Sequence, residues 1–303
     1  MAALAAGGRT GAQGDGLLKY ALLAPALVVI AATLGYPLVQ SFWYSLHDWN
    51  LGRQSTIGPY VGAANYVQAL TDDPEFWNSV RVTLVFTVAS VVLTLSVALA
   101  LAMLLAGGRA IEVNVRTLLV IPFAMSPALL GISWRFLLNP EFGAVDAVLK
   151  WLVPPLRGQA LLAEPTLAMC ALVLVDVWHW APYFMLTFVG ALASLPQDTI
   201  DAAEVDGASR FRAFFQVILP QLRPVLAITI LLKTIFSLKM LDQVVTMTSG
   251  GPGNSTTTLP YSIYETAFRF FDLGYGASVA YLLAAVMLVL AVIYSRMVTE
   301  KRA

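Results

Sequence analysis

The sequence has little charge and few of the residues that build reactive or metal sites. Charged residues make up 12% of its 303 positions, with two histidines and one cysteine, whereas hydrophobic residues reach 58%. A soluble domain carries roughly 25% charged and about 45–50% apolar residues, so this chain cannot cover a globule of its size with polar groups. The composition excludes an ordinary cytosolic enzyme and a disordered protein. It also excludes a disulfide-stapled domain, because the lone Cys170 has no partner within the chain.

Motifs for chemistry within the chain are missing as well. No glycine is followed by lysine, which excludes the phosphate-binding loop of ATPases, and no G-x-S-x-G nucleophile motif occurs. His47 and His179 lie far apart and do not form a zinc motif with one cysteine. The 18 basic and 18 acidic residues cancel, which removes a general case for nucleic-acid binding. We therefore expect a non-catalytic chain that holds no metal or cofactor of its own.

Long apolar stretches are abundant. A bilayer core of about 30 Å needs roughly 20 apolar residues of helix to cross it, and the mean hydropathy of the chain is +0.75. Six stretches are long enough, at about 20–46, 79–106, 117–138, 166–193, 225–247 and 274–295. The sequence thus predicts an all-α integral membrane protein with six transmembrane helices. Residues 1–16, rich in glycine and alanine, are expected to be a mobile cytoplasmic N-terminus, and 17–303 the membrane domain.

The basic residues orient these spans. With a cytoplasmic N-terminus, ten of them fall inside, namely Arg9, Lys19, Arg109, Arg116, Arg210, Arg212, Arg223, Arg296, Lys301 and Arg302. Four then fall outside, namely Arg53, Lys150, Arg157 and Arg269. Cytoplasmic loops carry the excess of lysine and arginine in membrane proteins. Both termini are therefore predicted to be cytoplasmic.

The longest predicted cytoplasmic connection, 194–224, contains signals for two short helices. Ser194 followed by Gln197 is typical of a helix start, and Gly207 permits the left-handed residue that ends a helix. Ser209 is a candidate cap for a second helix, which Pro220 separates from the next span. Such a pair would form a rigid projection. From these residues alone, docking on a partner and resting on lipid headgroups remain equally open.

Two faces inside the predicted spans are polar and aromatic. In the fourth span they comprise Asp176, His179, Trp180 and Tyr183, and in the fifth Lys233, Phe236, Ser237 and Met240. Aromatic rings beside hydrogen-bonding groups suit sugars, because rings stack on C–H faces while polar groups meet the hydroxyls. Two alternatives stay open: the rings pack against neighbouring spans, or Asp176 neutralises Lys233 as a structural pair.

The cytoplasmic connection also resembles a known motif. The run Asp201-Ala202-Ala203-x-x-Asp206-Gly207-Ala208, followed by Val217-x-Leu219-Pro220, is similar to the EAA loop of ABC importer permeases, with Asp201 where the family usually has Glu and Val217 where it has Ile. The resemblance extends over almost the whole chain from about residue 17, and its carbohydrate-importer branch, of the maltose and glycerol-phosphate permease type, is matched by Asn65-Tyr66, Phe76-Trp77, Ile121-Pro122, Asn139-Pro140, Phe142-Gly143, Trp178, Pro182-Tyr183 and Gly250-Gly251-Pro252.

This resemblance implies a function and partners. In the family the EAA loop docks on a cytoplasmic ATPase, which here assigns coupling to Asp201, Ala202, Ala203, Glu204, Asp206, Gly207, Ala208, Phe211, Phe214, Phe215, Leu219 and Pro220. It also implies a second homologous permease, two ATPase subunits that bind ATP and Mg²⁺, an extracytoplasmic solute-binding protein and a sugar substrate. The two polar faces would line the sugar site. A lysine at position 233 leaves open an anionic solute or a structural ion pair.

The sequence therefore predicts the membrane subunit of an ATP-driven, binding-protein-dependent sugar importer in the bacterial inner membrane, working by alternating access. The outer loops at 47–78 and 248–273 are the candidate contacts for the binding protein. An ion-driven secondary transporter is the main rival, and it predicts inverted repeats, discontinuous spans and a relay carboxylate. No internal repeat is visible in the sequence. Asp176 is the mid-span candidate for the relay carboxylate. A membrane-embedded enzyme is a weaker rival, because no nucleophile or metal motif is present.

Overall fold

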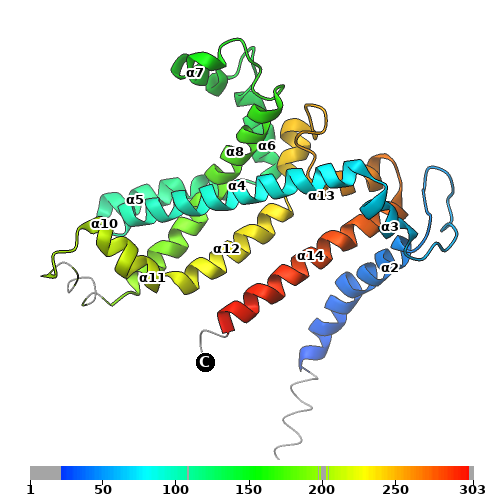
Figure 1. Cartoon of the computed structure of the whole chain (residues 1–303), viewed down its shortest axis with the longest axis horizontal. Helices are drawn as coiled ribbons and strands as arrows, with labels where there is room; N and C mark the ends of the chain where they lie inside the picture. The colour runs from blue at the N-terminus through cyan, green and yellow to red at the C-terminus, as the bar shows by residue number, and fades with distance from the viewer. Residues whose placement is uncertain (1–21, 108, 197, 199–202, 204, 300–303) are drawn as a thin grey trace, which may run out of the picture.

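The computed structural model describes residues 22–299 except 108, 197, 199–202 and 204. Within that part the chain is helical, and β-pairing is limited to two isolated bridges, His47 with Tyr60 and Asn50 with Asp272. Figure 1 shows long helices running side by side, with shorter ones gathered at their ends. The elements are η1 Ala31–Gly35, α2 Tyr36–Ser45, α3 Ala64–Thr71, α4 Pro74–Leu105, α5 Ala110–Leu119, η2 Ile121–Ala124, α6 Pro127–Leu137, α7 Ala144–Leu152, η3 Pro154–Leu156, α8 Pro165–Ala193, α10 Arg210–Ala213, η4 Phe214–Ile218, α11 Leu219–Gln221, α12 Arg223–Leu238, η5 Val244–Thr248, α13 Leu259–Tyr264, η6 Glu265–Arg269 and α14 Leu273–Thr299.

Four helices among the described residues are long and apolar enough to cross a membrane. They are Leu22–Ser45, Pro74–Leu105, Pro165–Ala193 and Leu273–Tyr294, and the number rises to six if each of two bent helix pairs is one span. The four correspond to the first, second, fourth and sixth predicted spans. The all-α membrane fold predicted from composition is therefore confirmed. The predicted N-terminal tail, 1–16, lies outside the described residues.

The third predicted span, 117–138, is not one continuous helix. Residues Ala110–Ala124 and Pro127–Leu137 form two helical segments that meet at 96°. The break has a local cause, because proline lacks the N–H that continues a helix and disfavours helical backbone in the residue before it. Ser126, just before Pro127, has extended backbone, and its hydroxyl accepts from the Leu129 N–H at 3.4 Å to start α6.

The fifth predicted span, 225–247, is also interrupted. Helix α12 ends at Leu238, and a separate helical turn, η5, follows from Val244. A broken helix leaves carbonyl groups without helical partners, and inside a membrane these must be satisfied by the protein. The hydroxyl of Thr258 donates to the Met240 carbonyl at 3.1 Å. The segment after the predicted span thus supports the break that the hydropathy pattern does not reveal.

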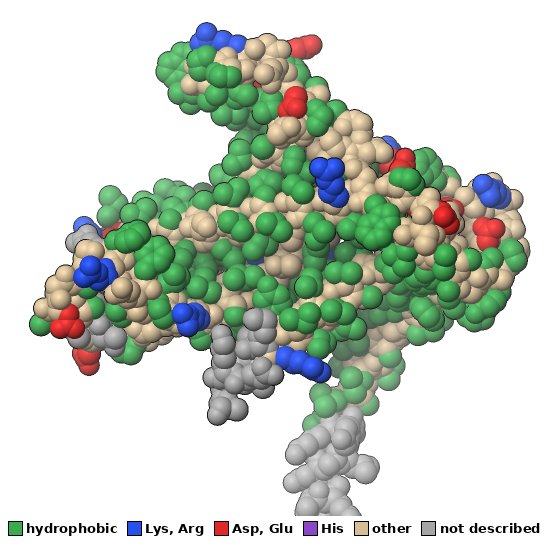
Figure 2. All heavy atoms as spheres, viewed as in Figure 1, with side chains coloured by type: hydrophobic (Ala, Val, Ile, Leu, Met, Phe, Trp, Pro, Cys, Tyr) green, Lys and Arg blue, Asp and Glu red, His purple; other side chains and the backbone are tan. Residues whose placement is uncertain are grey.

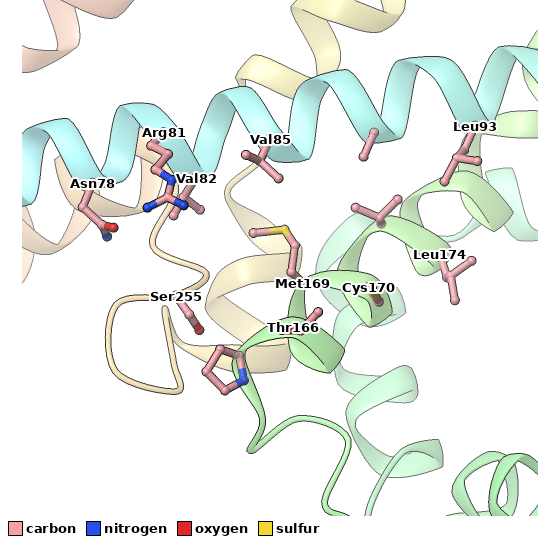
Figure 3. Close-up of a pocket in the computed structure, with 13 residues that line it drawn as sticks. Asn78, Arg81, Val82, Val85, Leu93, Thr166, Met169, Cys170, Leu174 and Ser255 are labelled. Carbon is pink, nitrogen blue, oxygen red and sulfur yellow. The ribbon is translucent and has the colours of Figure 1, made fainter. Parts of the chain in front are cut away.

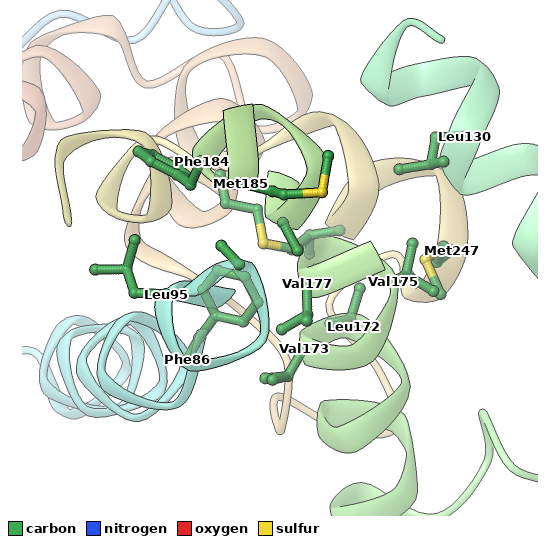
Figure 4. Close-up of a cluster of buried hydrophobic side chains, with 14 of the residues drawn as sticks. Phe86, Leu95, Leu130, Leu172, Val173, Val175, Val177, Phe184, Met185 and Met247 are labelled. Atoms are coloured by element: carbon green, nitrogen blue, oxygen red, sulfur yellow. The ribbon is translucent and has the colours of Figure 1, made fainter. Parts of the chain in front are cut away.

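The main core lies where α4 packs along α8, with contributions from α12 and η5. Figure 4 shows Phe86 and Leu95 from α4 facing Leu172, Phe184 and Met185 from α8. The contact face of α4 is not purely apolar. It buries a row of small hydroxyl residues at helical spacing, Ser79, Thr83, Thr87, Ser90 and Thr94. Small residues of this kind let membrane helices approach closely.

The two ends of the helix bundle differ. Figure 1 shows α5, α10 and α11 at one end of α4, whereas α3 and α13 lie at the other end. The first helical stretch, Leu22–Ser45, packs on α14, and its last residue, Ser45, is buried against Tyr66 of α3. None of its most apolar window is buried. Figure 2 shows hydrophobic atoms over much of the visible surface and charged atoms mainly at its edges. This distribution fits a protein whose sides face apolar surroundings.

Candidate functional site

A charged pair and two serines meet in the interior between α4, α8 and α12. The Nζ of Lys233 lies 2.5 Å from the Oδ2 of Asp176, and the Ser90 hydroxyl donates to the same carboxylate oxygen. Ser237 donates to the Ser90 hydroxyl at 3.4 Å. The side chain of Lys233 is fully buried, with 0% exposed, and that of Asp176 is 4% exposed. Three helices are thus joined by one polar chain in an otherwise apolar core.

This geometry shows which group neutralises the charge of Lys233 in the described conformation. A buried charge is tolerated when an opposite charge and hydrogen bonds compensate its desolvation. Lys233 and Asp176 provide that compensation to each other. Of the two alternatives left by the sequence, the lysine forms the ion pair. An anionic solute would have to displace Asp176 to reach it.

Aromatic rings cover the ion pair. Trp180 stacks on Phe236 with ring centroids 4.6 Å apart and an interplanar angle of 19°. The Nζ of Lys233 lies 5.5 Å from the centre of the Trp180 ring, within the range of a cation–π contact. Phe123 stacks on Tyr183 at 5.0 Å and 25°, and its edge approaches Trp180 at 5.6 Å. The predicted residues of the fourth and fifth spans are therefore brought together, from α8 and α12.

His179 and Met240 are placed differently. The His179 ring is buried, and its Nδ1 lies 3.0 Å from the carbonyl of Pro122, at the break between α5 and α6. Met240 belongs to the core, and its carbonyl accepts from Thr258. In this conformation both residues support the broken spans. Their predicted contact with a solute stays a prediction.

Two residues of this site were not predicted from the sequence. Ser90 belongs to the hydroxyl row on α4, whose spacing of three or four residues was the available signal. Phe123 lies in η2, one residue after Pro122, where the sequence predicted a straight span. The bend beside it brings the Phe123 ring against three aromatic or imidazole rings of α8, those of His179, Trp180 and Tyr183. A straight helix would give no reason to expect this.

The predicted coupling segment has the expected turn. Gly207 has φ +76°, a left-handed backbone that side chains other than glycine rarely adopt. The Ala208 N–H donates to the Ala203 carbonyl at 3.0 Å, across the turn at Gly207. Ser209 then accepts from the Arg212 N–H at 3.3 Å and begins the second. Asp201, Ala202 and Glu204, also assigned to coupling, lie outside the described residues.

The second helix of this segment is exposed and aromatic. Phe211 is 73% exposed and Phe215 is 48% exposed, whereas Phe214 is half-buried. Phe215 contacts both other rings, at centroid distances of 4.6 and 4.8 Å. Leu219 and Pro220 follow, and the helix meets α12 at 72°. The described helical part of the segment, 210–221, thus presents an uncovered aromatic surface and leads directly into α12.

Known proteins place these features in one family. Residues 97–300 match the family model described as the inner membrane component of binding-protein-dependent transport systems. The chain is 32% identical to the sulfoquinovosyl glycerol transport permease SmoG of Agrobacterium fabrum, over 95% of this chain and 92% of the relative. It is 34% identical to the trehalose/maltose transport permease MalF of Thermococcus litoralis, over 90% of each protein.

A solved structure has the same fold. A crystal structure of a bacterial ABC transporter involved in the import of the acidic polysaccharide alginate contains a chain that matches with a TM-score of 0.80 and 19% identity, covering 95% of this chain and 96% of that one. The family resemblance predicted from the sequence is confirmed, together with a multi-pass location in the membrane. The named relatives are permeases rather than enzymes. The chain belongs to the family of inner membrane components of binding-protein-dependent transport systems.

Proposed function

We propose that this chain is one of two membrane subunits of an ATP-driven importer for a sugar or sugar-like solute. Two separate ATPase subunits bind ATP and Mg²⁺, and an extracytoplasmic binding protein delivers the solute. The chain itself carries no catalytic group. The observation that carries the proposal is the projection at Gly207, because it joins the helices that hold the polar site to a surface outside the bundle.

Stiffness is what the coupling role requires. A flexible loop would absorb the movement of an ATPase, whereas two capped helices transmit it. Helix α8 carries Asp176 and Trp180, and α12 carries Lys233 and Phe236, so a displacement of the projection moves both sides of the site. The exposed Phe211 and Phe215 supply the apolar surface for a partner. Such exposed aromatic patches mark interaction sites in proteins.

The choice of a sugar rests on two supports. The relatives SmoG and MalF are named for transport of a glycoside and of disaccharides. The stacked rings of Trp180 and Phe236 adjoin hydrogen-bonding groups of Ser237 and Lys233, which is the combination that suits a sugar. Entry of the solute between α8 and α12 would place its hydroxyls near the ion pair and its C–H faces against the rings.

The uncovered surfaces suit further subunits. The stretch Leu22–Ser45 presents apolar side chains on nearly all sides, as expected for a helix that faces lipid or a second permease. The loops at 47–78 and 248–273 lie together, as the Asn78 amide donates to the Asn254 carbonyl at 2.9 Å. We assign this joint surface, on the outer side, to the binding protein.

An ion-driven secondary transporter is the alternative. It would use a carboxylate within a span as a proton or ion relay. Asp176 fits this role poorly, because its carboxylate is bound to Lys233 and Ser90 and is shielded from solvent. The single-chain transporter also leaves the exposed projection at Gly207 without a use.

Reconstitution distinguishes the two. The chain is placed in proteoliposomes with a second permease, an ATPase and a binding protein of the same importer, and uptake of labelled sugars is measured with and without ATP. We expect uptake to require both ATP and the binding protein. Gly207→Pro should abolish this uptake, whereas Gly190→Ala should preserve it. Uptake by this chain alone, driven by an ion gradient, would overturn the proposal.

A further inference from the structure

A groove runs along the outside of the bundle between α4 and the first half of α8. It has a volume of about 640 Å³ and is lined along its length by apolar side chains, among them Val85, Leu93, Met169 and Leu174. Figure 3 shows these side chains from the two helices facing the same space. The groove is separate from the site at Asp176, because neither that residue nor its partners line it.

One end of the groove is polar. Asn78 and Arg81 from α4 and Ser255 from the loop after η5 gather there (Figure 3). Among the described residues Arg81 has no acidic partner within 4.0 Å, and the buried hydroxyl of Ser255 has no hydrogen-bond partner. The Asn78 amide donates to the Asn254 carbonyl at 2.9 Å, which ties the loop that carries Ser255 to the end of α4 near Arg81. The exposed Arg81 guanidinium is thus left for an anion outside the chain.

The length of the groove indicates the size of the molecule that fits it. Twelve residues separate Arg81 from Leu93, and at about 1.5 Å per helical residue they rise about 18 Å. Half of a bilayer's hydrocarbon core is about 15 Å thick. The apolar part of the groove therefore spans one leaflet, with its cationic end at the predicted outer headgroup level.

We propose that the groove binds a glycerophospholipid of the outer leaflet. Its phosphate accepts hydrogen bonds from Arg81 at the polar end of the groove, and one acyl chain lies along Val85, Ala89 and Leu93 against α8. Arginine recognises phosphate through paired N–H donors. An apolar helix of a second subunit would cover the apolar part of the groove, but it would supply no acceptor for the Arg81 guanidinium.

An acidic group beside the groove wall, Glu164, is already engaged. Glu164 precedes Pro165 of the groove wall, and its carboxylate accepts from the Leu167 N–H at 2.7 Å as the cap of α8. The positive end of the α8 dipole opposes its charge. Glu164 is therefore held as a helix cap and is not left as a free carboxylate for Arg81.

The test is lipid retention by the purified full chain, followed by native mass spectrometry after delipidation. The probes are palmitoyl-oleoyl-phosphatidylglycerol and the palmitoyl-oleoyl-glycerol that lacks its phosphate. We expect the phospholipid to bind at least tenfold more tightly to the unaltered chain than to Arg81→Gln, and the diacylglycerol to bind weakly to both. Arg135→Gln, at another exposed arginine near the end of α6, is the matched control and should retain the lipid.

Two more variants keep the test decisive. Arg81→Lys retains the charge and should bind the phospholipid if Arg81→Gln fails through lost charge rather than misfolding. Ala89→Trp fills the groove and should remove binding although Arg81 is intact. Equal binding to Arg81→Gln and to the unaltered chain would overturn the phosphate site. In the assembled importer, a photoreactive residue at position 93 should capture lipid, and capture of the second permease instead would overturn the proposal.

Discussion

The Nζ of Lys233 lies 2.5 Å from the Oδ2 of Asp176, which joins α12 to α8 inside the bundle. Removing one member leaves the other as an uncompensated buried charge, which costs about 3–5 kcal/mol. We expect Lys233→Met and Asp176→Leu each to lower the thermal stability of the purified chain strongly. The double variant should recover most of it, because both charges are gone. If the double variant instead lost as much stability as the two single variants together, the pairing of Lys233 with Asp176 would be contradicted.

The ring pair over this site gives a second prediction. Trp180→Phe keeps a ring against Phe236, whereas Trp180→Ala removes the stack and the ring facing Lys233. Aromatic pairs are worth about 0.5–1.5 kcal/mol beyond their buried area. We expect Trp180→Ala to raise the KM for uptake several-fold and Trp180→Phe to have a small effect. If both variants transported normally while remaining stable, the rings would not contact the solute.

Gly207 tests the projection through its backbone. Its φ of +76° is unfavourable for other residues, although a Cβ there would meet no atom within 4 Å. The left-handed conformation costs roughly 1–2 kcal/mol for an ordinary residue, and less for asparagine. ATP-dependent uptake should therefore fall in the order Gly, Asn, Ala at position 207. Gly190→Ala is the control, because it also meets no atom and lies within α8.

A fourth prediction concerns the contact between the two broken spans. A Cβ on Gly131 of α6 would lie 1.8 Å from the Oγ1 of Thr246 in η5. Overpacking of this kind costs typically about 1–3 kcal/mol. Gly131→Ala should destabilise the chain in a thermal unfolding assay. Adding Thr246→Ala removes the clashing hydroxyl and should restore part of the loss, whereas Thr246→Ala alone should change little.

The fifth prediction concerns the stability of the chain at acid pH. Hydrogen bonds from the Leu167 and Thr166 N–H groups lower the pKa of Glu164 from its ordinary value of 4.5. A lowered pKa means that the carboxylate stabilises the fold above pH 4.5, and that this contribution is lost as the pH falls through the folded-state pKa. At pH 7 the unaltered chain should therefore have a higher melting temperature than the Glu164→Gln variant. The difference should shrink at lower pH, and a difference independent of pH would contradict the cap.

The sequence was sufficient for some features and not for others. Hydropathy located the long helices, and the residues around Gly207 predicted both the turn and the Ser209 cap, because these are local. The breaks in the third and fifth spans were missed. Average hydropathy over a window does not detect the helix break at Pro127, nor the hydrogen bond from the Thr258 hydroxyl to the Met240 carbonyl. Residue spacing predicted that Asp176 and Trp180 share one helix face. The hydrogen bond from Ser90 to Asp176 could not be predicted, because it depends on how α4 packs against α8.

Coupling of this chain to a separate ATPase is the central claim. It is tested most directly by ATP hydrolysis in proteoliposomes that hold the assembled importer, with the binding protein and labelled solute outside. The account predicts hydrolysis that the loaded binding protein stimulates, and Gly207→Pro should abolish this stimulation together with uptake while assembly is retained. Normal stimulation and uptake in that variant would contradict the account.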